Sequence, residues 1–304
     1  MGRNARILLA VIGILGLVAT SCAKSTPTAN GPKVTPTPTT SIGDCVTNAG
    51  TEQPAAPKGV DFKTQLKEQG VLNIGSDNAY APFESIPTGQ TAPVGFDVDL
   101  YKEVAKRLGL TAKSTTTSFD GLFTSSLPTG KFDLGVSAIT IKDSRKKTVD
   151  FTIPYFVANL SLAVNSQKTP TLHSIDGLAG QTIGVQTGTT SEDCAKALVK
   201  QGKAKDIKSY DTAELAFDDL VAGRVAGVIN DTPASVGIIA SRTAIKIVQI
   251  IETNEKYGFA VSKNKPDLRE AVNTAMKNMM TDGTFTTIYQ TWFKTPPPFK
   301  VPIE

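Results

Sequence analysis

The stretch that decides the fold is Phe132-Asp133-Leu134-Gly135-Val136-Ser137-Ala138-Ile139-Thr140-Ile141-Lys142-Asp143-Ser144-Arg145. Its apolar beginning predicts a buried strand, which ends in small and hydroxylated residues such as Ala138 and Thr140. In an open α/β sheet, ligands bind beyond the carboxyl ends of the strands, where small residues let the backbone approach them. Arg145 follows with a planar guanidinium that suits a carboxylate. A strand exit with a surface arginine is the alternative, and this stretch alone favours neither.

The composition is that of an ordinary globular protein. The chain has 304 residues, 40% of them hydrophobic and 20% charged, which is enough for one large or two medium domains. The formal net charge is +4, with no basic block of the kind that follows a phosphate backbone, so we expect no nucleic-acid partner. One histidine and three cysteines leave no cluster for zinc or copper, and we expect no metal and no cofactor.

The N-terminal residues resemble a bacterial lipoprotein signal. Two arginines precede an apolar run, Ile7 to Val18, and small residues lead to Cys22. The run is short for a membrane-spanning helix. We therefore expect residues 1–22 to be a signal peptide, and the exported protein to be anchored to the outer face of the cell membrane by lipidated Cys22. Ala19 stands where such signals more often have leucine, and an ordinary secretory signal is the alternative.

Residues 23–56 are rich in Thr, Pro, Ser, Ala and Gly. Such a segment cannot bury enough apolar surface to offset the entropy of ordering, so we expect a disordered tether. Cys45 lies in this tether and Cys194 in the folded body. Export places both where disulfides persist, and a bond between them would pin the tether to the body. Two free thiols are the alternative, because sequence does not show whether their Cα atoms come within reach.

Two stretches of the body repeat one pattern. In residues 127–136 and again in residues 220–228, a helix end, a glycine and a basic residue precede a strand. The second strand ends in the polar residues Asn230 and Asp231. This weak internal repeat predicts two α/β halves that each direct a strand end toward a shared cleft.

Other polar residues also follow predicted strands. Asp77 and Tyr80 come after one strand, and Gln186 and Thr190 come after another, at residues 181–185. The helix that starts near Thr190 would present its first N–H groups to an anion. A helix cap without a ligand role is the alternative for this position.

Taken together, these residues make the chain similar to the extracellular solute-binding proteins that serve ABC importers of polar amino acids. The resemblance covers residues 61–293. The motifs that carry it are Tyr80-Ala81-Pro82-Phe83, Gly95-Phe96-Asp97-Val98-Asp99-Leu100, Ile139-Thr140-Ile141-Lys142-Asp143-Ser144-Arg145-Lys146-Lys147, Val149-Asp150-Phe151 and Asn230-Asp231-Thr232-Pro233.

The resemblance implies the two-lobed periplasmic-binding-protein fold of type II, an α/β fold with two hinge strands. Lobe one would comprise residues 57–156 and 254–304, and lobe two residues 157–253. The hinges would lie near Val157 and Glu252. Such lobes close over a ligand through contacts that exist only in the closed state.

The resemblance also assigns ligand contacts. Arg145 would grip the α-carboxylate of an amino acid, and Asp231 would bind its α-ammonium from the other lobe. Further contacts to these charged groups would come from Ala138, Thr140 and Thr190. Tyr80 and Phe119 would enclose the ligand side chain, while Asp77 and Gln186 occupy positions that vary with ligand identity.

Elementary electrostatics agrees with the two charged assignments. A free amino acid carries adjacent opposite charges, and a dry cleft needs a partner for each. Two alternatives stay open. Asp231 fits a helix N-cap before Pro233, and Tyr80 and Phe119 are of a type common in hydrophobic cores.

The identity of the ligand is less constrained. Gln186 stands where glutamine-binding members of the family have lysine, which removes a cation from the expected pocket. An acidic ligand side chain beside Asp77 would need another cation, so glutamate and aspartate are disfavoured. Glutamine and the cationic amino acids both remain, because Asp77 can accept from an amide or pair with a cation.

The function implied by the resemblance is that of a substrate-binding lipoprotein of an ABC amino-acid importer, monomeric and not an enzyme. Its partners would be a free amino acid and a membrane permease. A sensor that presents its ligand-bound form to another membrane protein is one alternative. A cyclohexadienyl-dehydratase-like enzyme is another, and it would need a general acid or base aimed at the ligand.

Overall fold

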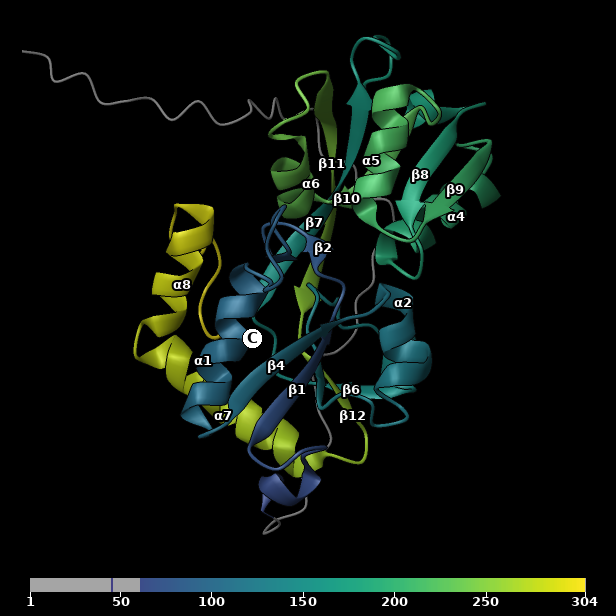
Figure 1. Cartoon of the computed structure of the whole chain (residues 1–304). Coiled ribbons are helices and arrows are strands. Elements are labelled where there is room, and N and C mark those ends of the chain that lie inside the picture. The colour runs from purple at the N-terminus through teal and green to yellow at the C-terminus, as the bar shows by residue number, and fades with distance from the viewer. Residues whose placement is uncertain (1–44, 46–60, 304) are drawn as a thin grey trace, which may run out of the picture. The chain divides into compact units, whose positions relative to one another are not determined.

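The computed structural model describes Cys45 and residues 61–303, and two five-stranded sheets organise this part of the chain (Figure 1). The first sheet consists, in spatial order, of β4 (Thr111–Thr116), β1 (Val71–Ser76), β5 (Leu134–Gly135), β12 (Ala260–Ser262) and β6 (Val149–Phe151). The predicted signal peptide, its Cys22 and the tether other than Cys45 lie outside the described residues.

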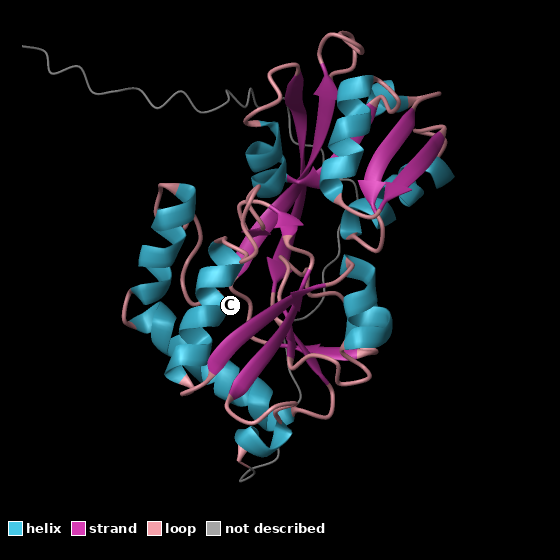
Figure 2. Ribbon diagram, viewed as in Figure 1, coloured by secondary structure: helices cyan, strands magenta, loops and turns pink. Residues whose placement is uncertain are grey.

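The second sheet has the same number of strands. In spatial order it consists of β11 (Ile245–Tyr257), β7 (Phe156–Asn165), β10 (Gly227–Asp231), β8 (Thr182–Gln186) and β9 (Asp206–Tyr210). Helices pack against both sheets (Figure 2). We call the part of the chain built on the first sheet the first half and the part built on the second sheet the second half.

The two halves share a topology. In the first half β1 pairs in parallel with β4 and β5, and in the second β8 pairs in parallel with β9 and β10. The connecting helices also correspond, since α1 (Phe96–Arg107) leads into β4 and α4 (Thr190–Lys200) leads into β9. The weak repeat in the sequence therefore marks equivalent strands, β5 and β10, and the strand ends of both halves carry polar residues.

The remaining elements are short strands, short helical turns and four longer helices, α5 to α8. They are η2 (Phe62–Gln65), β2 (Ala79–Tyr80), β3 (Glu84–Ser85), α2 (Phe119–Gly121), η3 (Leu122–Ser126), α3 (Asp143–Lys146), η4 (Ile175–Leu178), α5 (Ala213–Ala222), α6 (Thr232–Ile239), α7 (Pro266–Thr281) and α8 (Thr284–Phe293). None of the helices within the described residues has both the length and the apolar character to cross a membrane.

A pair of antiparallel strands carries the chain between the halves. β7 and β11 pair from Asn165 and Ile245 to Phe156 and Tyr257, with an irregularity after Ile251. β11 continues through the polar residues 252–256 as far as Tyr257, and its pairing with β7 resumes at Glu255. The predicted hinges lie in these two strands, and the lobe boundaries stay a prediction.

The largest cluster of buried hydrophobic side chains extends over both halves. It contains a group of aromatic rings, in which Phe83 meets the rings of Phe96, Phe156 and Tyr257 edge-on. Aliphatic side chains dominate the core beside the second sheet, and buried Cys45 lies among them. A disulfide joins Cys45 to Cys194 of α4, so one residue of the N-terminal segment is fixed to the second half.

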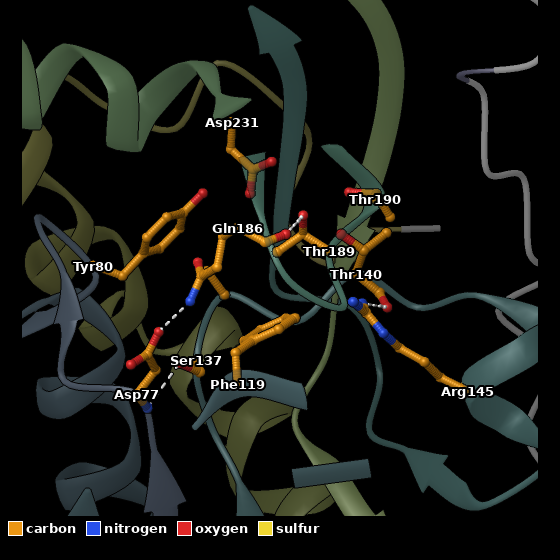
Figure 3. Close-up of a pocket in the computed structure, with 11 residues that line it drawn as sticks. Asp77, Tyr80, Phe119, Ser137, Thr140, Arg145, Gln186, Thr189, Thr190 and Asp231 are labelled. Carbon is orange, nitrogen blue, oxygen red and sulfur yellow. Dashed lines mark hydrogen bonds between the residues drawn. The ribbon is translucent and has the colours of Figure 1, made fainter. Parts of the chain in front are cut away.

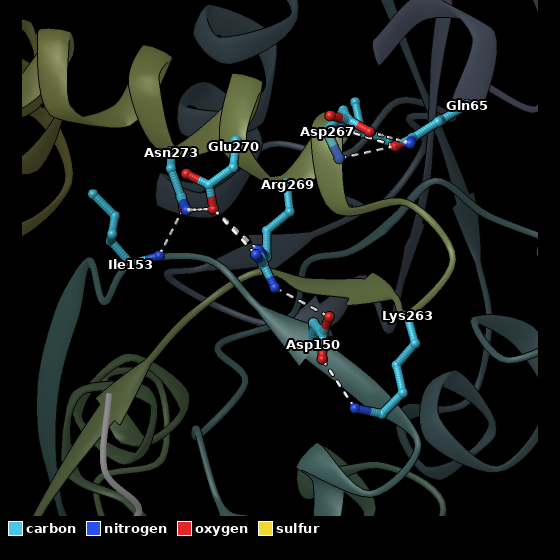
Figure 4. A network of polar contacts seen from close by, with 9 residues as sticks. Gln65, Asp150, Ile153, Lys263, Asp267, Arg269, Glu270 and Asn273 are labelled. Carbon is cyan, nitrogen blue, oxygen red and sulfur yellow. Dashed lines mark hydrogen bonds and ion pairs between the residues drawn. The ribbon is translucent and has the colours of Figure 1, made fainter. Parts of the chain in front are cut away.

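A polar network attaches α7 to the first sheet (Figure 4). Arg269 is only 1% exposed, and its Nη1 lies 3.1 Å from Oδ2 of Asp150 in β6. Lys263 pairs with the other oxygen of the same carboxylate at 3.0 Å. At the start of α7 the Gln65 side chain accepts hydrogen bonds from the backbone N–H groups of Asp267 and Leu268. The buried cation thus has a partner, as burial of a charge requires.

Candidate functional site

Strand and helix ends from both halves enclose a small pocket (Figure 3). Its lining residues are Asp77, Tyr80, Phe119, Ser137, Ala138, Thr140, Arg145, Gln186, Thr189, Thr190 and Asp231. The structure therefore gathers every residue that we predicted to bind a ligand, together with Ser137 and Thr189, which we did not. The cavity volume is about 10 Å³, which is room for about one water.

Arg145 lies on α3 and is only 5% exposed. Its Nη1 donates to the carbonyl of Thr140 at 2.8 Å, and its Nη2 donates to the carbonyl of Gly188 at 2.9 Å. The guanidinium carbon lies 5.1 Å from the ring centroid of Phe119 and 4.6 Å from that of Phe123. Burial lowers the pKa of Arg145 to about 10, so the group is still charged at neutral pH.

The charge of Arg145 is not matched by an anion of the protein. Among the described residues no carboxylate lies within ion-pair distance of its guanidinium, although acidic groups occur farther away. The guanidinium has five N–H donors. The carbonyls of Thr140 and Gly188 accept from two of its nitrogens, which leaves other donors for a ligand. A buried cation with spare donors in a pocket is suited to bind a carboxylate.

Asp231 supplies the opposite charge at the end of β10. The hydroxyl of Tyr257 donates to its Oδ2 at 2.5 Å. Burial raises the pKa of Asp231, and this hydrogen bond acts in the opposite direction. Asp231 occupies the N-cap position of α6, but its side chain makes no capping hydrogen bond. The predicted N-cap position of Asp231 is therefore confirmed, but without a side-chain capping bond, and its carboxylate lines the pocket.

Asp77 and Gln186 meet across the pocket. Gln186 Nε2 donates to Asp77 Oδ2 at 2.6 Å and to the carbonyl of Asp211 at 3.0 Å. Asp77 follows β1 and Gln186 ends β8, so the bond joins the two halves. Burial raises the pKa of Asp77 to about 7; the bond from Gln186 lowers it and the negative charge of Asp211 raises it.

Ala138 has a backbone conformation that few non-glycine residues adopt. Its φ is 46°, in the left-handed region, and a buried hydrogen bond from its own N–H holds this conformation. The Ala138 N–H donates to Oδ2 of buried Asp97 at 2.8 Å, and the Tyr155 hydroxyl donates to the same oxygen at 2.8 Å. Asp97 lies in the first turn of α1, behind the pocket, and acts through the backbone rather than as a pocket-lining group.

Gly95 allows α1 to begin close to the preceding chain. A Cβ atom at this position would lie 1.9 Å from the carbonyl oxygen of Phe83, and the φ of Gly95 is 150°. Only glycine fits there. Gly95 thus allows α1 to begin where the Asp97 carboxylate can accept the hydrogen bond from the Ala138 N–H.

Thr140 and Thr190 share a partner that sequence reasoning missed. Both hydroxyls donate to Oε2 of Glu255, at 2.5 Å from Thr140 and at 2.9 Å from Thr190. Side chains alternate in β11, so that Thr253, Glu255 and Tyr257 are buried while Asn254 is exposed, and no local pattern of the sequence indicates this burial. Thr189, not Thr190, is the N-cap of α4, and its side chain accepts from the Glu192 N–H.

A larger hollow also borders Arg145. Its volume is about 320 Å³, and it is lined by Asp120, Phe123, Thr124, Lys142, Ser144, Arg145, Thr148, Gly188 and Asp193. Lys142 and Asp193 form an ion pair of 2.6 Å between the halves at this site. Within Cys45 and residues 61–303, no three His, Cys, Asp or Glu side chains gather in a way that could hold a metal ion.

Comparison with known proteins gives a consistent result. Residues 72–295 match the family described as bacterial extracellular solute-binding proteins, family 3. The L-cystine-binding protein TcyJ of Escherichia coli (strain K12) is 30% identical over 230 residues, which cover 75% of this chain and 85% of that protein. A putative ABC transporter arginine-binding protein 2 from the same organism is 32% identical over 238 residues, which cover 77% and 95%.

Solved structures are similar as well. An ancestral arginine-binding protein bound to arginine has a TM-score of 0.70 and 35% identity, over 74% of this chain and 98% of that one. An ancestral amino acid-binding protein described as a precursor of cyclohexadienyl dehydratase has a TM-score of 0.68 and 33% identity, over 77% and 100%. These likenesses and the two sheets confirm the predicted type II periplasmic-binding-protein fold.

Proposed function

The chain belongs to the bacterial extracellular solute-binding proteins of family 3, and from this premise we propose that it is the substrate-binding lipoprotein of an ABC amino-acid importer. In this role it captures a free polar amino acid between two closing lobes and delivers it to a membrane permease without changing it chemically. The relatives support an amino-acid ligand, because their names specify cystine, arginine and histidine.

One observation carries the proposal. Arg145 and Asp231 are both buried, line the same pocket and have no oppositely charged protein group within ion-pair distance among the described residues. Leaving either charge unpaired in a dry site is costly. A zwitterion resolves both deficits, with its carboxylate at Arg145 and its ammonium at Asp231.

The charge of the pocket favours a cationic amino acid over glutamine. Asp77 adds a second carboxylate to the lining, and its partner is the neutral amide of Gln186. A cationic ligand side chain would neutralise Asp77, whereas glutamine would only replace the amide contact. The arginine-binding proteins among the relatives and similar structures support this order of preference.

Capture requires the two halves to separate and close again. The cavity of about 10 Å³ is too small for an amino acid, while contacts such as Gln186–Asp77 and Lys142–Asp193 join the halves. In the proposed cycle these contacts break on opening, and the closed form then surrounds the ligand. The strand pair β7–β11 would serve as the hinge.

The remaining parts of the proposal concern the N-terminal residues and the partners. We propose export, lipidation of Cys22 and anchoring to the outer face of the membrane, with the monomer as the working state. Mass spectrometry of the membrane fraction would detect a diacylglycerol-modified Cys22. A Cys22→Ala variant released into the medium would support anchoring, and one retained like the wild type would contradict it.

A thermal-shift screen of the protein against the common amino acids and L-cystine tests the proposed ligand class. A ligand that binds only the native state at 100 times its Kd stabilises it by about 2.7 kcal/mol. We expect the largest shift with L-arginine or L-lysine and a smaller one with L-glutamine. A flat screen would contradict the importer function. Turnover of an added ligand, with Asp77 or Asp231 as acid or base, would favour the dehydratase-like enzyme instead.

A further inference from the structure

Glu255 is a buried carboxyl group behind the pocket. It lies in β11, its side chain belongs to a residue that is 1% exposed, and it is not among the pocket-lining residues. Its Oε2 receives two hydroxyl hydrogen bonds, while its Oε1 is buried and has no hydrogen-bond partner among Cys45 and residues 61–303. An ionised carboxylate with one oxygen left bare in this way would be costly, because Oε1 has lost water without gaining a protein donor.

The two hydroxyls that meet Glu255 come from opposite halves of the molecule. Thr140 follows β5 of the first half, and Thr190 is the first residue of α4 in the second half. Both also line the pocket beside Arg145. Among the described residues, Glu255 is therefore hydrogen-bonded to the pocket lining through two threonines, one from each half.

The protonation state of Glu255 decides what these threonines present to the pocket. Each hydroxyl has a single proton. When Glu255 is ionised, both protons point to Oε2, so the hydroxyls turn only lone pairs toward a ligand. Lone pairs repel a carboxylate, which is the ligand group expected at Arg145.

We propose that Glu255 is a positioning residue that holds a proton when the amino acid binds and thereby turns a threonine hydroxyl toward the ligand carboxylate. The acid O–H donates to Thr140 Oγ1, whose own proton is then free for the ligand, and Thr190 continues to donate to Oε2. The proton is taken from the solvent. This inference rests on the proposed function, since it needs a carboxylate beside Arg145.

The charged groups around Glu255 agree with this arrangement. Burial raises the pKa of Glu255 to about 8; the negative charge of Asp231 raises it further, whereas the two threonine hydroxyls and the charge of Arg145 lower it. The other titratable groups that face it are Tyr80 and Tyr257, whose pKa values are raised well above 10.0, so that both are neutral. A ligand carboxylate would add negative charge and favour the protonated form still more.

The direction in which ligand affinity changes with pH follows from the coupling of ligand binding to proton uptake by Glu255. Below the pKa of about 8 the acid already carries its proton, and binding takes up none at this site. Above it the free protein is ionised, so binding must take up a proton. Affinity then falls by up to about tenfold per pH unit, the limit for one coupled proton.

The test is calorimetric titration of the protein with L-arginine between about pH 6 and about pH 9.5, in buffers of different ionisation enthalpy. We expect the wild type to take up close to one more proton in the upper part of this range than Glu255→Gln does. With its amide nitrogen at the position of Oε2, the glutamine donates to both hydroxyls, which frees their protons for the ligand as the protonated acid frees that of Thr140, and it cannot titrate. Glu255→Gln should therefore bind as well as the wild type at pH 6 and lack the loss at high pH.

A matched control is Glu192→Gln. Glu192 is a partly buried carboxylate on α4 that accepts from the Gly188 N–H and pairs with Lys196, and its pKa is lowered. It is ionised throughout the range, so its variant should keep the proton uptake of the wild type. Asp77 and the ligand ammonium titrate in all three proteins, and the difference between wild type and Glu255→Gln removes their contributions.

Two results would overturn the proposal: equal proton uptake by wild type and Glu255→Gln, or an affinity of Glu255→Gln that is lowered equally at every pH. An infrared measurement needs no ligand. At about pH 6 the wild-type spectrum minus that of Glu255→Gln should contain the carbonyl stretch of a protonated carboxylic acid. If no amino acid binds, the proposed function fails, and a difference spectrum without this band still refutes the protonated Glu255.

Discussion

Gln186 Nε2 and Asp77 Oδ2 lie 2.6 Å apart, and this hydrogen bond joins the end of β8 in one half to the residue after β1 in the other. The amide thus satisfies a buried carboxylate from across the pocket. In the proposed function, a nitrogen of the ligand side chain would reach the same carboxylate, so Gln186 would have to move aside or share Asp77 with the ligand. Asp77 is therefore the residue most able to distinguish cationic from neutral ligands.

Asp77→Asn should weaken L-arginine far more than L-glutamine. Removing the anion that faces a buried cation costs about 2–5 kcal/mol, or at least about 30-fold in Kd. The side-chain amide of L-glutamine, in contrast, can hydrogen-bond to the amide of asparagine. Competition calorimetry with both amino acids measures the two effects. Asp211→Asn is the control, because it removes the charge of the exposed Asp211 side chain and keeps the backbone carbonyl that accepts from Gln186, and it should change either Kd less than about fivefold. Equal losses for both ligands would contradict the assignment.

The pH dependence of L-arginine binding gives a second test of Asp77. Its pKa is raised from 3.8 to about 7, so the carboxyl is partly protonated at neutral pH. Because a cationic ligand prefers the ionised form, arginine affinity should rise as the pH increases from about 6 to about 7.5. The rise should be absent in Asp77→Asn, and a flat wild-type profile over this interval would refute the pairing.

Gly188→Ala should impair closure. A Cβ atom on Gly188 would lie 2.7 Å from Oδ1 of Asp120 in the other half, and the φ of Gly188 is 75°. Gly180→Ala is a matched control, because Gly180 has a φ of 74° and nothing within 4 Å of a Cβ atom. Both variants should lose stability through backbone strain, of the order of 1 kcal/mol, but only Gly188→Ala should weaken ligand binding. Calorimetry beside thermal melts separates the effects, and equal affinities would contradict closure by this contact.

The free energy of unfolding should fall as the pH rises. Burial raises the pKa of Asp97 from 3.8 to about 7 and that of Glu255 from 4.5 to about 8. Between the unfolded and folded values these two groups bind more protons in the native state than in the unfolded state, so the stability that they contribute is full below about pH 4 and declines up to about pH 8. Urea denaturation at a series of pH values measures this slope, which Glu255→Gln should reduce. A wild-type stability that rises from pH 5 to pH 8 would refute it.

The Cys45–Cys194 disulfide should contribute strongly to stability. It closes a loop with a sequence separation of 149 residues, and both cysteines are buried in the core beside the second sheet. Loss of such a bond costs about 2–5 kcal/mol. Cys45→Ser and the reduced wild type should unfold at similar, lower urea concentrations than the oxidised wild type. Coincident curves for oxidised and reduced protein would contradict this contribution.

The sequence predicted much of the fold because its strand ends carry unusual residues. Apolar runs that end in Ser137, Ala138 and Thr140, or in Asn230 and Asp231, predict buried strands that stop at a cleft. Family motifs then identified the residues that the structure gathers in the pocket. The structure places these residues around one pocket. That they contact a ligand there stays a prediction.

Other features could not be read from the sequence. Glu255 lies in a polar segment beside the predicted hinge near Glu252, and only pairing of β11 with β7 turns its side chain inward. The Gln186–Asp77 bond depends on how the two halves meet, which no local pattern determines. The positive φ of Ala138 arises from a distant carboxylate, Asp97, that holds its N–H. Each of these features depends on a contact between residues that are far apart in the sequence. The spacing of apolar residues indicates only the local secondary structure and burial.

The most direct test of the account is calorimetric titration of the protein with L-arginine, L-argininamide and N-acetyl-L-arginine. The first offers both charges of the zwitterion, the second lacks the carboxylate expected at Arg145, and the third lacks the ammonium expected at Asp231. We predict that only L-arginine binds tightly and that each analogue is at least about 30-fold weaker, the cost of one unpaired buried charge. Binding of either analogue as tight as that of L-arginine would contradict capture of a zwitterion between Arg145 and Asp231.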